Sequence, residues 1–229
     1  MGKAIHKILD WSEVWALLIP LTILLWKKNK IAYLKPIRIY VGTTLLLNTG
    51  IVLISECKGK WGLQQGDFLW NNNVLYNIGS ILRLLLFAWF FNLLGQRFMH
   101  RLKIIIPFAF LLCVLINFIF YENFMPVGAL ESFSSRLLST EAALLLFYCL
   151  QYFIFLMIED KPTKLSFQQG VWVVTGLSIY ISVSFFIFLF YSYLSKVTKD
   201  FAVNIWDVHN IVFIILCLFI AKQFYQENE

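Results

Sequence analysis

Seven stretches of this sequence are each long and apolar enough to cross a lipid bilayer. A helix of about 20 residues spans the hydrocarbon core. In lipid every backbone polar group must find a partner within the protein, which leaves helices or closed barrels. The stretches are apolar nearly all round and do not alternate with polar residues, which excludes a barrel. We expect helical spans at residues 11–26, 37–55, 74–94, 104–120, 136–158, 171–194 and 202–221.

The composition indicates an all-α membrane protein with a single domain. Hydrophobic residues make up 60% of the 229 positions and charged residues 14%, with a mean hydropathy of +0.74. Such a composition excludes an ordinary soluble enzyme. Seven spans leave about 90 residues for all loops and both tails, which is too few for a separate folded domain. We therefore expect residues 1–229 to form one bundle of seven transmembrane helices in contact with membrane lipids.

The basic residues predict how the bundle is oriented. The first, third and fifth loops and the C-terminal tail hold 11 Lys and Arg residues, against 7 on the opposite side. This asymmetry predicts an N-terminus outside and a cytoplasmic C-terminus. Because topology accounts for the positive charge, we expect no nucleic-acid partner. The longest loop, Glu56 to Asn73, contains three glycines and is a candidate lid over the outer face.

Polar side chains inside the apolar spans are the candidate functional residues. Each charged residue costs roughly 2.5–3.5 kcal/mol at mid-bilayer, so such residues are expected to face the bundle interior. The deepest charge, Arg83, lies about 14 Å into its span. In the expected orientation these residues occupy the outer half or the middle of the bilayer, which predicts a polar cavity open to the outside. The expected ligand-binding residues are Arg83, Glu141, Asp207, His209, Asn77 and Asn48.

Spacing and charge balance support this cavity. Polar residues on the third span, from Asn73 to Arg83, recur at intervals of four, three and three, which places them on one helix face. Arg83 can neutralise either Glu141 or Asp207. The remaining acid then needs a charged His209, a bound cation or its own proton. A spare acid suits a pH-sensitive site or a ligand amine, whereas a purely structural salt bridge beside a neutral acid is the alternative.

No motif identifies a reaction, a cofactor or a metal site. The four cysteines show no C-x-x-C spacing, and His209 has no second histidine at ligand spacing. We expect no cofactor, no metal and no catalytic residues. Two alternatives stay open, namely a proton- or ion-coupled transporter and a membrane-embedded lipid-modifying enzyme that uses Glu141 or Asp207 with His209 as an acid and base.

Two segments, Asn73 to Phe91 and Ile205 to Phe219, resemble stretches of uncharacterised seven-helix integral membrane proteins of Bacteroidetes, which are often encoded near sensor histidine kinases. The most recognisable pieces are Leu75-Tyr76-Asn77 and the pattern of Trp206, His209 and Asn210. The sequence departs at Arg83, where similar proteins are expected to carry an acid. The resemblance implies a bacterial inner membrane and a membrane partner such as a sensor kinase. The expected function is a sensory or regulatory subunit that binds a small polar or amphipathic ligand and signals to a separate partner.

Overall fold

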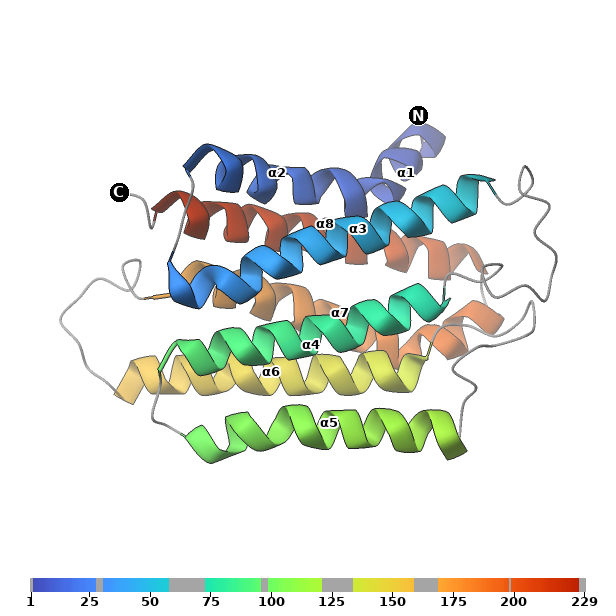
Figure 1. Ribbon diagram of the computed structural model, residues 1–229. Coiled ribbons are helices and arrows are strands. Elements are labelled where there is room, and N and C mark those ends of the chain that lie inside the picture. Colours follow the sequence, from blue (N-terminus) through green and yellow to red (C-terminus); the bar gives the residue numbers. More distant parts are fainter. Residues whose placement is uncertain are drawn as a thin grey trace.

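The computed structural model describes residues 2–27, 31–57, 73–95, 99–120, 134–158, 169–197 and 199–226, and in these ranges it contains helices and no strands. A helix of nine residues, α1 (Gly2–Asp10), comes first. A short 3-10 turn, η1 (Ala32–Leu34), leads into α3. The long helices are α2 (Ser12–Lys27), α3 (Lys35–Cys57), α4 (Asn73–Leu93), α5 (His100–Phe120), α6 (Ser135–Ile158), α7 (Val171–Val197) and α8 (Lys199–Gln226) (Figure 1).

Each predicted span coincides with one long helix. Among the described residues, six helices, α3 to α8, are long and apolar enough to cross a membrane, which makes this a multi-pass membrane protein. The helix α2 has 16 residues, and at 1.5 Å per residue its length of roughly 24 Å is shorter than a hydrocarbon core of about 30 Å. A seventh crossing therefore stays a prediction. The helix α1 was not expected, and residues 58–72 of the candidate lid lie outside the described residues.

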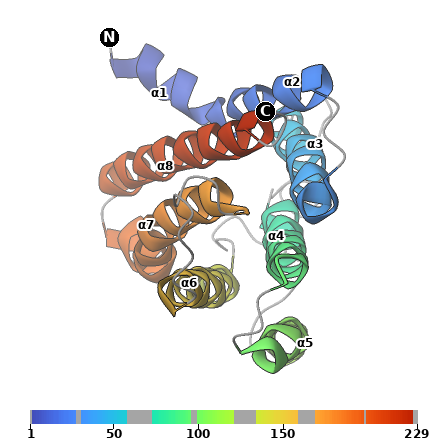
Figure 2. The same cartoon turned by 90° about the vertical axis from the view of Figure 1, so that its left-hand side faces the viewer.

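The long helices form a ring with one helix outside it. Viewed from one end, α2, α3, α4, α6, α7 and α8 follow one another around a closed circuit, each packed against the next, while α5 lies outside against α4 and α6 (Figure 2). The two chain ends lie at opposite ends of the bundle (Figure 1). We call the end that carries α1 the outer end and the other the inner end, following the predicted orientation.

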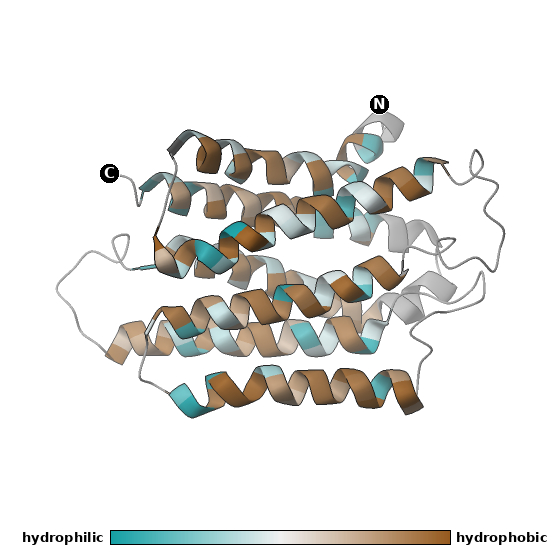
Figure 3. Cartoon of the chain, in the orientation of Figure 1, coloured by the Kyte–Doolittle hydropathy of each residue, from teal (hydrophilic) through white to brown (hydrophobic). Residues whose placement is uncertain are grey.

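Apolar residues predominate along the described parts of the long helices (Figure 3), and they include both buried and exposed side chains. Outward-facing residues of α5, such as Phe108 and Ile119, are each 70% exposed, as expected for side chains that face lipid. Inside the ring, the buried core lies mainly toward the inner end. It includes Phe87, Phe90 and Phe91 of α4, Val174 and Leu177 of α7, and Leu216, Ile220 and Phe224 of α8.

Close packing of α7 against α8 positions the polar part of the bundle. A Cβ atom added at Gly176 of α7 would lie 2.6 Å from Cβ of Phe219 on α8, so only glycine permits this approach. Tyr180 lies one helical turn further along α7. The close approach therefore brings the Tyr180 side chain against α8 at His209, where the two ring centres are 5.3 Å apart.

Candidate functional site

Arg83 and Glu141 form a buried ion pair between α4 and α6. Arg83 donates from Nε to Oε1 of Glu141 and from Nη2 to Oε2, at 2.7 Å for the second contact. Ser80, one turn before Arg83, also donates to Oε2, at 2.6 Å. The Glu141 side chain is 0% exposed and that of Arg83 14%. Two parallel hydrogen bonds of this kind give a strong and geometrically specific pair, so Arg83 and Glu141 neutralise each other.

Hydrogen bonds extend from this ion pair to α7 and α8. Arg83 donates from Nη1 to the Tyr180 hydroxyl at 2.9 Å. Tyr180 in turn lies 3.5 Å from Nε2 of His209, whose Nδ1 is 3.0 Å from Oγ of Ser184. The Tyr180 oxygen accepts from Arg83 and its hydrogen remains for donation to His209 Nε2; in the tautomer that accepts it, Nδ1 carries the imidazole hydrogen and donates to Ser184. The ion pair thereby becomes part of a polar network that joins α4, α6, α7 and α8.

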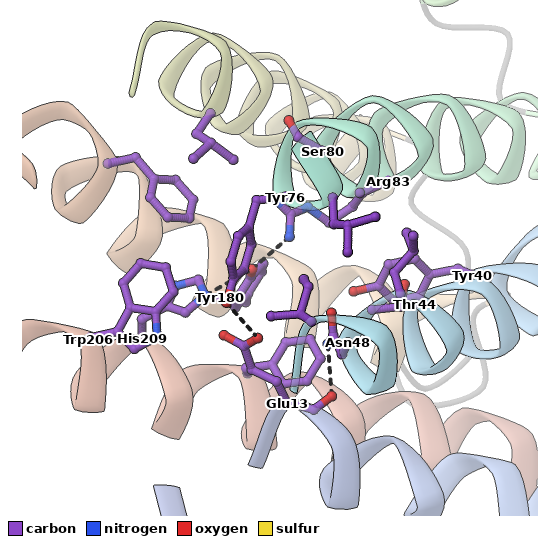
Figure 4. A pocket seen from close by; sticks show the side chains of 17 residues that line it. Glu13, Tyr40, Thr44, Asn48, Tyr76, Ser80, Arg83, Tyr180, Trp206 and His209 are labelled. Carbon is purple, nitrogen blue, oxygen red and sulfur yellow. Dashed lines mark hydrogen bonds between the residues drawn. The ribbon is translucent and has the colours of Figure 1, made fainter. Parts of the chain in front are cut away.

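This polar network borders a small cavity inside the ring, which we call the inner cavity (Figure 4). The inner cavity has a volume of about 50 Å³ and is lined by residues of all six ring helices. A water molecule needs roughly 10–15 Å³ measured in this way, so the inner cavity accommodates a few waters or one small polar group. The polar side chains in its wall are Glu13, Tyr40, Thr44, Asn48, Tyr76, Ser80, Arg83, Tyr180 and His209.

A second and larger cavity, the outer cavity, lies at the outer end of the bundle. It has a volume of about 590 Å³, which is large enough for a small organic molecule. The helix α1 forms one of its walls, and α2, α3, α4 and α8 form the others. Four residues line both cavities and mark the boundary between them, namely Glu13, Ile51, Tyr76 and Trp206.

Glu13 is the acidic residue at this boundary, and it was not among the predicted site residues. Its backbone oxygen accepts a hydrogen bond from Asn48 at 2.8 Å, and its Oε2 lies 3.5 Å from the Tyr76 hydroxyl. In Figure 4 its carboxylate points toward Tyr76. Glu13 is only 9% exposed. Because Glu13 lies near the start of the first apolar span, the sequence alone suggests an acid at the membrane surface. The packing of α2 against α3 and α8 buries it instead.

The structure brings four of the six predicted residues to the inner cavity. Arg83, His209 and Asn48 line it, and Glu141 lies directly behind its wall through the contact with Arg83. Asn77 is buried on α4 but does not line either cavity. Tyr180 and Ser184, which complete the hydrogen-bond network, were missed because tyrosine and serine are common within apolar helices; their i, i+4 spacing was the available signal.

Asp207 lies apart from Arg83. Its carboxylate is 2.6 Å from Nδ1 of His6, a residue of α1, and its side chain is 16% exposed. The expected choice of Arg83 between two acids is therefore resolved in favour of Glu141. Asp207 contacts His6 instead, which was not among the expected site residues. The physical reason is α1, which packs against α8 and brings His6 to the first part of that helix.

Comparisons of the chain with protein-family models, with curated proteins and with solved structures find no match.

Proposed function

We propose that this protein is a sensory or regulatory subunit of a bacterial inner membrane. It binds a small polar or amphipathic ligand that enters from the outer end, and it passes a shift in helix packing to a separate membrane protein such as a sensor kinase. The observation that carries this proposal is the polar network of Arg83, Glu141, Tyr180 and His209, which borders a cavity and joins four helices.

The network suits a switch because its parts depend on each other. A ligand group that hydrogen-bonds to Arg83 or Tyr180 competes with contacts that hold α4 against α6 and α7. A ligand can change the arrangement of helices only if it binds one arrangement more tightly than another. The small volume of the inner cavity supports such a difference, because a group larger than a few waters requires the surrounding helices to move.

A proton- or ion-coupled transporter is the second candidate. Glu13 favours it, because a buried carboxylate beside a cavity can take up a proton or a cation. Transport also requires an opening toward the inner end, where the described residues form the packed apolar core around Phe87, Phe90 and Leu216. We therefore prefer the sensory function.

The proposal is tested by ligand binding and by helix movement in the purified protein. Small polar and amphipathic compounds are screened for a rise in melting temperature in nanodiscs. Spin labels at Leu46 of α3 and Phe186 of α7, exposed 75% and 60% respectively, then report whether a stabilising compound changes the distance across the ring. In the unmodified protein we expect a compound that raises the melting temperature and also changes the distance between the two spin labels.

Gly79→Leu provides the matched site variant. Gly79 lines the inner cavity, and a Cβ atom there would meet only Leu47, at 3.8 Å, so leucine can extend into the cavity with little strain. Gly42→Leu is the control, since a Cβ at Gly42 has no neighbour within 4 Å. We expect Gly79→Leu to abolish the ligand effects and Gly42→Leu to keep them. A melting temperature that no compound alters would refute the proposed function.

A further inference from the structure

The carboxylate of Glu13 is largely buried and forms no ion pair within the part of the chain that the structure describes, where its Oε2 contacts the Tyr76 hydroxyl. The contacts between an acid and a basic side chain found there are Arg83 with Glu141 and His6 with Asp207. Arg83, the nearest buried cation, already makes two hydrogen bonds to Glu141 and one to Tyr180. A buried charge without a partner is costly, so Glu13 is suited to a positive charge that comes from outside the protein.

The outer cavity around Glu13 carries an excess of negative charge. Its wall includes three acids, Asp10, Glu13 and Glu56, against one lysine, Lys7, and one histidine, His6, which contacts Asp207. Burial, together with the nearby charge of Asp207, raises the pKa of Asp10 above its ordinary value, with the nearby His6 opposing this rise. The wall thus attracts cations and disfavours anions before any specific contact is made.

Aromatic rings stand beside the Glu13 carboxylate. Tyr76 and Trp206 line both cavities, and their rings meet edge to face with centres 6.2 Å apart. Trp11 adds a further aromatic side chain to the outer cavity. The faces of tryptophan and tyrosine attract organic cations, and quaternary ammonium groups in particular. Metal ions are less suitable, since the described residues contain no group of three or more His, Cys, Asp or Glu side chains that could hold one.

The inner cavity offers a hydrogen bond next to this place. The Tyr40 hydroxyl is buried, lines the inner cavity, and makes no hydrogen bond within the described residues. Buried polar groups normally have a partner, so this hydroxyl is available to a small polar group that enters past Glu13. This unpaired group is independent of the acidic charges and also points to a ligand.

We propose that the ligand is a small organic ammonium ion, whose positive nitrogen lies among Glu13, Tyr76 and Trp206 while a polar end reaches toward Tyr40. This inference rests on the proposed function, because it names the ligand class of the same site. The ammonium group can belong to a soluble compound or to a lipid head group, since both present the same chemistry to the outer cavity.

Choline is a suitable probe. The full chain is placed in nanodiscs of phosphatidylglycerol, and binding of radiolabelled choline is measured. We expect saturable binding that the uncharged analogue, with carbon in place of the nitrogen, does not compete away. Glu13→Gln should weaken binding about tenfold or more because it removes the charged contact. Equal competition by choline and its uncharged analogue, or unchanged affinity in Glu13→Gln, would overturn the proposal.

Trp206→Leu tests the aromatic contact independently of charge. We expect it to weaken choline binding about threefold to thirtyfold. Trp26→Leu is its matched control, because Trp26 lies at the end of α2 opposite Glu13 and is 78% exposed. The Trp26→Leu variant should bind choline with the affinity of the unmodified protein. Melting temperatures of all variants verify that they are folded. Equal affinities of the two tryptophan variants would contradict the aromatic contact.

Two further measurements identify the source of the ammonium group and show whether this inference or the proposed function has failed. If nanodiscs with phosphatidylcholine suppress the binding of added choline, the head group occupies the site; if they do not, the site takes soluble cations. Stabilisation by uncharged or anionic compounds, with none by choline, would overturn the ammonium inference and leave the proposed function standing. Stabilisation by no compound at all would overturn both.

Discussion

Arg83 is the residue on which the polar part of the bundle depends. Its guanidinium group is held by Glu141 and Tyr180, and it thereby links the acid on α6 to the tyrosine and histidine on α7 and α8. Arginine suits this position because its planar group can bind a carboxylate with two hydrogen bonds and still reach a third partner. A lysine could not make this set of contacts.

Removing one member of the ion pair is expected to be more harmful than removing both. Glu141→Leu leaves the Arg83 charge buried, which should lower the free energy of unfolding by about 3–5 kcal/mol. The double variant Arg83→Met and Glu141→Leu leaves no unpaired charge and should recover most of this loss. Thermal melting in a mild detergent measures both. A double variant that melts below the single variant would show that the pair itself stabilises the bundle.

Among the elements, α1 and α7 have the largest effect on the site. The helix α1 closes one side of the outer cavity. Its His6 contacts Asp207, so that this acid does not pair with Arg83. The helix α7 carries Tyr180 and Ser184 on one face, and its close approach to α8 at Gly176 brings both to His209. The position of His209 is therefore set by helix packing as well as by its own hydrogen bonds.

Gly176→Ala tests this packing. The added Cβ would overlap Phe219, so α7 and α8 must separate, and we expect a loss of about 1–3 kcal/mol. Gly50→Ala in α3 is the matched control, because its Cβ meets no atom within 4 Å and alanine favours a helix by up to about 1 kcal/mol. Melting temperatures should fall for the first variant and stay level or rise for the second. The same sign for both variants would contradict the close approach.

At the scale of the whole molecule, the ring of six helices has two parts: an outer half that contains the cavities and an inner half that contains the apolar core. Both cavities belong to the outer half, and the core around Phe87 and Leu216 fills the inner half. Two tyrosines that are buried near the inner end are hydrogen-bonded to nearby backbone: Tyr148 donates to the backbone oxygen of Lys103, and Tyr152 to that of Gln169. This arrangement supports the proposed entry of a ligand from the outer end.

Reporter fusions test both the orientation and the number of crossings. Because the chain ends lie at opposite ends of the bundle (Figure 1), and the basic loops favour an internal C-terminus, a C-terminal green fluorescent protein should fluoresce and an N-terminal alkaline phosphatase should be active. Seven crossings place the ends on opposite sides of the membrane. Reporters that place both ends on the same side would mean that α2 does not cross.

The helices themselves could be predicted from the sequence alone. Apolar runs of sufficient length determine where a chain crosses lipid, because unpaired backbone groups are intolerable there, and the long helices lie where those runs lie. The contact between α4 and α6 was likewise foreseeable in part, since a deep charge such as Arg83 requires an acid, and the sequence offers few.

Which acid pairs with Arg83, and which buried acid forms no ion pair, was decided only by the tertiary structure. Glu141 and Asp207 are similar in sequence terms, each lying a few positions into an apolar run. Asp207 contacts His6 because α1 packs on α8. Glu13 is buried because α2 closes the ring, and among the described residues it forms no ion pair. Partner choice depends on how helices rotate and pack against one another, and an apolar run specifies its own length and depth but not its neighbours.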